Sequence, residues 1–87
     1  ETTAATFLAT INELNLNDSK IATSKINPLG GAIAQGNPLG ATGAIRTSTL
    51  LHAMRRVNKV KKSKLKYGMV AIDIAPNLGA CSIFESL

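Results

Sequence analysis

The sequence predicts an α/β fold made of a helix, a glycine-rich loop, a second helix and a terminal β-hairpin. Apolar residues recur with helical spacing in residues 2–14 and again from about residue 40 to residue 57. Residues 67–74 are rich in Val and Ile, and residues 79–85 form a second short segment typical of a strand. Between the helices, residues 27–43 hold five of the seven glycines and two of the three prolines. A loop so constrained usually positions something.

The first predicted helix, residues 2–14, has an apolar stripe formed by Ala4, Phe7, Leu8, Ile11 and Leu14. Threonine is a middling helix former, so we expect burial of this stripe to supply the stability. The helix should stop at the polar residues Asn15, Asn17 and Asp18. Residues 15–26 are predicted to be a polar loop, with a short extended piece at residues 25–26.

The second predicted helix carries apolar residues at Ala41, Ala44, Ile45, Leu51 and Met54. Gly43 lies in its first turn and is a poor helix former, which predicts close packing or the close approach of a ligand there. The free N–H groups of a helix N-terminus at this point can serve an anion or an oxyanion. His52 is interpreted as an ordinary residue of a helix face.

The two predicted strands should form an antiparallel hairpin joined by a turn at residues 75–78. The apolar run of the first strand suggests burial on both faces. Cys81 falls within the second strand and is interpreted as a small buried hydrophobe.

Composition limits the chain to at most one small domain of 87 residues. The single cysteine excludes an internal disulfide and a metal cluster held by several cysteines, and no metal site is predicted. No apolar run reaches about 18 residues, so no membrane span is expected.

Seven of the ten basic residues lie between Arg55 and Lys66, with no acidic residue among them. Such a cluster can meet the phosphates of nucleic acid, anionic lipid or a nucleotide. No aromatic residue stands between the first and the last of these basic residues, which makes nucleic acid the weaker choice. The alternative is a solvated connection between a helix and a strand.

The run Asn-Pro-Leu-Gly-Gly-Ala-Ile-Ala-Gln-Gly-Asn-Pro-Leu-Gly-Ala-Thr-Gly-Ala, residues 27–44, resembles the C-terminal signature of the thiolases, N-P-x-G-G-A-I-A-x-G-H-P-x-G-x-[ST]-G-A. Residues 68–85 resemble the end of that family in register, and Glu1 fits the segment after the family's active-site Asn. The resemblance implies that residues 1–87 are a C-terminal segment of a thiolase-like domain. The fold would be part of a layered α-β-α architecture that is incomplete without its remainder.

The resemblance also implies where the active site lies. Asn37 stands where the family has the histidine that activates a nucleophilic cysteine, and Asp73 stands where it has a second cysteine that moves the α-proton. A carboxamide can donate a hydrogen bond but cannot act as a general base, whereas a carboxylate is a weak one. Gly36, Pro38, Gly40 and Ala75 correspond to positions that contact the acyl-CoA substrate.

The turn departs from the family pattern as well. Ala75 replaces a glycine whose N–H helps to form an oxyanion hole, and Pro76 restricts the residue before it to extended backbone. Asn77 replaces the next glycine and tolerates a left-handed conformation better than most residues.

Three functional hypotheses follow. In the first, the chain belongs to a non-catalytic, structural thiolase-like subunit of a homo- or hetero-oligomer. In the second, it is part of a working 3-ketoacyl-CoA thiolase of fatty acid metabolism, with a nucleophile elsewhere and Asp73 as an altered base. In the third, it is a basic binding module that acts through residues 55–66. The resemblance implies a mitochondrial or peroxisomal location, no covalently bound cofactor, and a coenzyme A thioester as the possible substrate.

Overall fold

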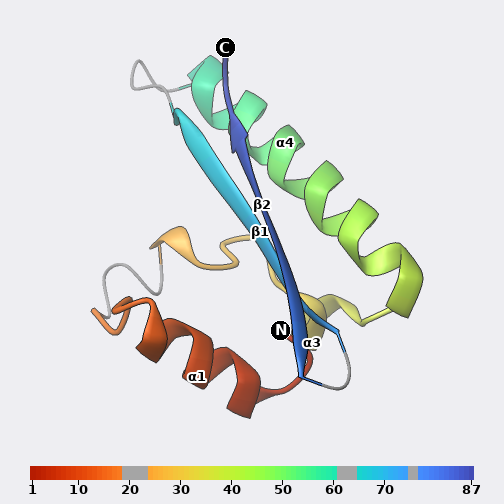
Figure 1. The fold of residues 1–87 in the computed structure, drawn as a ribbon. Helices are drawn as coiled ribbons and strands as arrows, with labels where there is room; N and C mark the ends of the chain where they lie inside the picture. The colour runs from red at the N-terminus through yellow and green to blue at the C-terminus, as the bar shows by residue number, and fades with distance from the viewer. Residues whose placement is uncertain (19–23, 61–64, 75–76) are drawn as a thin grey trace. The chain divides into compact units, whose positions relative to one another are not determined.

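The computed structural model describes residues 1–18, 24–60, 65–74 and 77–87, and it confirms the predicted α/β order of elements (Figure 1). The elements are helix α1 (Ala4–Glu13), the short helix α3 (Ala32–Gln35), the 3-10 helix η1 (Leu39–Ala41), helix α4 (Thr42–Val60) and strands β1 (Tyr67–Ile74) and β2 (Leu78–Glu85). Residues Glu1–Pro38 and Leu39–Leu87 form two compact units.

Threonine side chains begin helix α1. Thr3 is its N-cap residue, and the Thr3 Oγ1 accepts a hydrogen bond from the Thr6 N–H at 3.2 Å. In return the Thr3 N–H donates to the Thr6 Oγ1 at 3.3 Å. This reciprocal pair is a capping box, which satisfies two backbone donors that the helix itself leaves open. The helix therefore begins at Ala4, later than predicted, and part of its stability is local.

Asn15 ends helix α1, as the sequence predicted. Its backbone φ of 54° lies in the left-handed region, and its N–H donates to the Asn12 carbonyl at 3.0 Å. The Leu16 N–H donates to the Ile11 carbonyl at 2.8 Å. These two bonds form a Schellman motif, which satisfies carbonyls left open at the helix end.

The predicted apolar stripe of α1 is only partly covered. Phe7 and Ile11 are half-buried, whereas Leu8 is 59% exposed. The short extended piece predicted at residues 25–26 is wrong, because Lys25 is helical and Ile26 lies in a bend.

The two Asn-Pro-Leu-Gly tetrapeptides adopt different structures. Residues 27–30 form a turn in which the Gly30 N–H donates to the Asn27 carbonyl at 2.8 Å. In residues 37–40, Leu39 has a φ of 47° and begins η1, which runs directly into α4. Identical residues thus end in a turn at one place and open a helix at the other, so the surrounding chain decides between them.

Strands β1 and β2 form a two-stranded antiparallel sheet in the predicted hairpin arrangement. The register pairs Gly68 with Phe84 and Ile72 with Ala80. Residues opposite each other in such a pair share a face, and successive residues alternate between faces. Gly68, Val70 and Ile72 of β1 are half-buried, while the residues between them are exposed.

Helix α4 packs on β1 (Figure 1). A Cβ added to Gly68 would lie 2.6 Å from the Met54 Sδ and 2.9 Å from the Leu50 Cδ1, distances that real Cβ atoms do not show. A Cβ on Gly43 would lie in ordinary contact, 3.6 Å from the Ile72 Cδ1, so this packing does not itself require a glycine at position 43. The helix and the strand thus meet near the start of α4, at Gly43, and again near its middle, at Leu50 and Met54.

This packing corrects the predicted apolar face of the second helix. Met54 is buried and Leu50 half-buried, whereas Ile45 and Leu51 are 41% and 40% exposed. The physical reason is that the helix turns its Leu50–Met54 side, and not its Leu51 side, toward the strand. The buried residues in the described part of the chain are Gly31, Ala32, Thr42 and Met54.

Two further burial predictions are wrong in this structure. Strand β1 was predicted to be buried on both faces, but Tyr67, Met69, Ala71 and Asp73 are all exposed. Cys81 pairs with Ala71 in the register and is exposed with it. Alternation places these residues on the hairpin face opposite Gly68 and Ile72, and none of the described residues on that face is buried.

We expect Thr3→Ala to destabilise helix α1 by about 1 kcal/mol, because it removes the side-chain acceptor at the N-cap. Amide hydrogen exchange in residues 4–13 of the complete protein measures this directly. Thr3→Ser keeps the hydroxyl and should retain the protection. Equal exchange in the Ala and Ser variants would contradict the capping role.

We expect Gly68→Ala to destabilise the protein by about 1–3 kcal/mol, because the new methyl group overlaps Met54 and Leu50. Gly79→Ala is the matched control, since a Cβ there would lie 3.5 Å from the Ile72 carbonyl oxygen, an ordinary contact. Urea denaturation of both variants makes the comparison. A Gly79→Ala variant as unstable as Gly68→Ala would show that the helix contact is not the cause.

Candidate functional site

Three of the residues predicted to contact the substrate, Gly36, Pro38 and Gly40, follow directly after α3. Gly36 is the C-cap of α3, has a φ of 91°, and donates its N–H to the Ala32 carbonyl at 2.8 Å. A positive φ favours glycine, so Gly36 turns the chain from the helix into Asn37 and Pro38. Both of these residues are exposed. Gly40 follows in η1, and a Cβ there would meet nothing within 4 Å.

Asp73 lies near the end of β1, directly opposite Gly79 in the register. It is exposed, on the same hairpin face as Ala71, so the cost of a buried carboxylate does not arise in this structure. Asn37 belongs to the unit Glu1–Pro38 and Asp73 to the unit Leu39–Leu87. A pocket that both side chains share therefore stays a prediction.

The turn after Asp73 is described only in part. Ala75, predicted to contact the substrate, and Pro76 lie outside the described residues. Asn77 has a φ of 59°, which confirms the left-handed conformation expected at this position. A hairpin loop of three residues commonly needs this conformation at its last residue, just before the second strand begins at Leu78.

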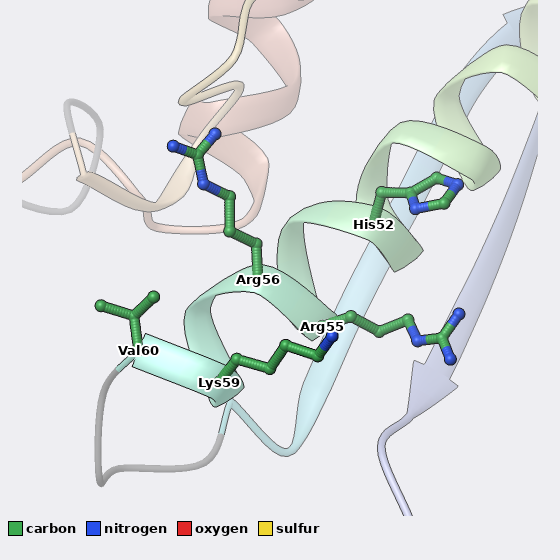
Figure 2. A pocket seen from close by; sticks show the side chains of 5 residues that line it. All are labelled: His52, Arg55, Arg56, Lys59 and Val60. Atoms are coloured by element: carbon green, nitrogen blue, oxygen red, sulfur yellow. The ribbon is translucent and has the colours of Figure 1, made fainter.

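A hollow of about 430 Å³ lies along the C-terminal half of α4 and is lined by His52, Arg55, Arg56, Lys59 and Val60. Figure 2 shows the side chains of Arg55 and Arg56 leaving α4 in different directions. None of the lining residues is acidic, and no acidic side chain among the described residues pairs with them. The arrangement can attract an anion by its summed charge.

Sequence reasoning found Arg55, Arg56 and Lys59 but left His52 and Val60 out of the basic cluster. His52 lies on a helix face, as predicted. The signal that joins it to the cluster is helical spacing, because residues three, four, seven and eight positions apart share one side of a helix. Lys61, Lys62 and Lys64 of the predicted cluster lie outside the described residues.

Two general features of the described residues also bear on function. No described helix combines the length and the apolar character needed to cross a membrane. Nor do any three described His, Cys, Asp or Glu side chains gather closely enough to hold a metal ion.

Comparison with known proteins identifies the family. The family model for the C-terminal domain of thiolase matches residues 1–86. The peroxisomal 3-ketoacyl-CoA thiolase of Homo sapiens is 42% identical over 66 residues, which cover 76% of this chain and 14% of the human protein. The peroxisomal 3-ketoacyl-CoA thiolase B of Rattus norvegicus is 45% identical over 65 residues, covering 75% of this chain and 14% of the rat protein.

The peroxisomal 3-ketoacyl-CoA thiolase 1 of Arabidopsis thaliana is 42% identical over 85 residues, covering 98% of this chain and 17% of the plant protein. The chain thus spans less than a fifth of the length of these relatives. No solved structure matches it significantly. Because the family match extends over the same helix, glycine-rich loop, helix and hairpin that make up the fold, this chain belongs to the thiolase family, within the C-terminal domain.

Proposed function

We propose that this chain is the C-terminal segment of a thiolase-like subunit that keeps the family fold but does not supply the family's two proton-moving side chains. The observation that supports the proposal is that Asn37 and Asp73 stand where the family resemblance leads us to expect a histidine and a cysteine, in a chain that the family model matches over residues 1–86. The subunit would serve a structural, non-catalytic role in a larger assembly.

The carboxamide at Asn37 is the stronger of the two arguments. An imidazole accepts and releases a proton near neutral pH, which makes it able to activate a thiol. A carboxamide has no basic nitrogen, so Asn37 can only donate or accept hydrogen bonds. It can therefore hold a thioester oxygen in place without generating a nucleophile.

The carboxylate at Asp73 changes the second step. A carboxylic acid has an ordinary pKa of about 4 and a thiol one of about 8.5, so the carboxylate is the weaker base toward an α-proton. Its negative charge would also oppose the formation of a thiolate nearby. Both effects act against thiolase chemistry at this position.

The surroundings that we propose are the remainder of a thiolase fold and further subunits. Large apolar side chains are exposed on the hairpin, among them Tyr67, Leu78 and Ile83 at 58%, 62% and 70%. Such side chains are suited to burial against the rest of a domain or against another subunit. The named relatives are peroxisomal, so we place this protein in the peroxisome in preference to the mitochondrion.

The alternative is a working 3-ketoacyl-CoA thiolase, as the names of the relatives indicate for those proteins. The nucleophilic cysteine would then lie outside this chain, and Asp73 would act as an altered base on a coenzyme A thioester. Activity of the complete protein separates the two possibilities, because a general base contributes a measurable factor.

We expect the complete protein to show no thiolysis of acetoacetyl-CoA, with or without Asp73→Ala. Under the alternative, Asp73→Ala should lower kcat by about 10²- to 10⁴-fold, the usual contribution of a general base. Glu13→Ala, which removes an exposed carboxylate at the end of α1, is the control. The measurement is the formation of acetyl-CoA with time.

Turnover that disappears in Asp73→Ala and persists in Glu13→Ala would overturn the non-catalytic proposal. The double substitution Asn37→His with Asp73→Cys tests it in the opposite direction. Reactivity that arises only in this variant would support the view that the fold persists and only the reacting groups were lost.

A second candidate function is the binding of a phosphate-bearing anion at the basic hollow of α4. The specific observation is that His52, Arg55, Arg56 and Lys59 line one hollow without an acidic partner among the described residues. Exposed cations of this kind attract anions in a manner that salt screens.

For this second function we expect Arg55→Glu to weaken the binding of inorganic pyrophosphate to the complete protein by about fivefold or more. Lys25→Glu makes the same charge change at an exposed residue of the other unit and should leave binding unchanged. Titration calorimetry at low and at high salt measures both. Equal loss in the two variants would mean that only net charge matters and that no site exists.

A further inference from the structure

The Glu1 carboxylate touches two separate parts of the glycine-rich segment. Its Oε2 accepts a hydrogen bond from the Asn27 Nδ2 at 2.9 Å, and its Oε1 accepts one from the Ile33 N–H at 3.3 Å. All three residues belong to the unit Glu1–Pro38. One side chain thus ties the residue at the start of the turn 27–30 to the first turn of α3.

Gly31 leaves the space that this contact needs. Gly31 is buried, and a Cβ there would lie 2.7 Å from the Asn27 Nδ2 and would overlap the Glu1 carboxylate. Gly31 is also the N-cap residue of α3 and has no side chain to accept a hydrogen bond from the helix. The Glu1 carboxylate takes that role from a distant point in the sequence, since Ile33 is one of the residues whose N–H lacks a partner within the helix.

The far end of α3 is tied to the same turn. The Gln35 Nε2 donates a hydrogen bond to the Leu29 carbonyl at 2.5 Å, and the Gly36 N–H closes the helix on the Ala32 carbonyl. Both ends of α3 are therefore bonded to other parts of residues 1–36: the first turn to Glu1, and the last residue to Leu29. Asn37 follows directly after Gly36. The direction in which the chain runs from α3 into Asn37 depends on these bonds.

We infer that Glu1 is a positioning residue for the glycine-rich segment, and that its carboxylate sets the conformation of residues 27–36 and thereby the place of Asn37. Glu1 acts through Asn27 and Ile33 and is not assigned any contact with substrate. The inference does not depend on whether position 37 takes part in catalysis, and so it stands or falls separately from the proposed function.

Amide hydrogen exchange and the chemical shift of the Ile33 amide proton in the complete protein test this inference. We expect Glu1→Ala to speed the exchange of Ile33 by about tenfold, because the N–H loses a charged acceptor. We also expect the Ile33 amide proton to move upfield. Glu1→Gln should fall between, since one amide oxygen cannot accept both bonds in the same way. Glu13→Ala, at the other end of α1, should change neither signal.

Two comparisons separate positioning from a general loss of stability. Exchange in strand β1 should stay at the wild-type rate in Glu1→Ala and in Glu1→Gln. Gly31→Ala should also speed the exchange of Ile33, but by a smaller factor when Glu1 is already Ala, because part of the overlap is then gone.

An Ile33 signal in Glu1→Ala that matches Glu13→Ala would overturn the inference. The inference would also be overturned if Gly31→Ala speeded the exchange of Ile33 by the same factor in the wild-type protein and in Glu1→Ala. Where Glu1→Ala loosens β1 as well, the Glu1→Gln variant decides: a selective change at Ile33 supports the inference, and a change spread over both units refutes it.

Discussion

Packing of α4 across one face of the hairpin is the contact on which the order of Leu39–Leu87 depends. Gly68 has no Cβ, and so Met54 and Leu50 can approach the strand more closely than they could if any other residue stood at position 68. Because side chains alternate along a strand and opposite residues share a face, this one contact decides which residues of both strands turn away from the helix. Asp73 is among those residues, and its place in the hairpin is a consequence of the packing rather than of its own chemistry.

The unit Glu1–Pro38 is held in a different way. Its described residues include few buried side chains, and its order comes from hydrogen bonds at the ends of short elements: the capping box at Thr3, the Schellman motif at Asn15, and the bonds that Glu1 makes to Asn27 and Ile33. Such bonds contribute about 1 kcal/mol each on balance, and bonds to a charged group such as the Glu1 carboxylate contribute about 1.5–3 kcal/mol. A unit built from many weak local bonds keeps its elements, but it gains most of its stability from whatever it packs against.

Local chemistry made part of the fold predictable. The stop at Asn15 and the left-handed Asn77 follow from properties of asparagine that act within a few residues, and the hairpin follows from strand composition on either side of a turn. Several wrong predictions concern burial, namely the apolar face of the second helix, both faces of β1 and Cys81, because apolar spacing shows that a face exists but not which neighbour covers it. The contact between Glu1 and Ile33 joins residues far apart in sequence, so no local pattern announces it.

Different residues shape this backbone and would move protons, with little overlap between the two groups. Gly68 and Gly31 are required by close approach, and Asn77 by a left-handed turn, whatever stands at positions 37 and 73. Asn37 follows the C-cap residue Gly36, and Asp73 lies opposite Gly79 in the hairpin. Neither side chain disturbs those requirements. Selection for the fold alone would therefore leave both positions free to change. Membership of the family fixes the scaffold, while under our proposal proton transfer depends on those two side chains.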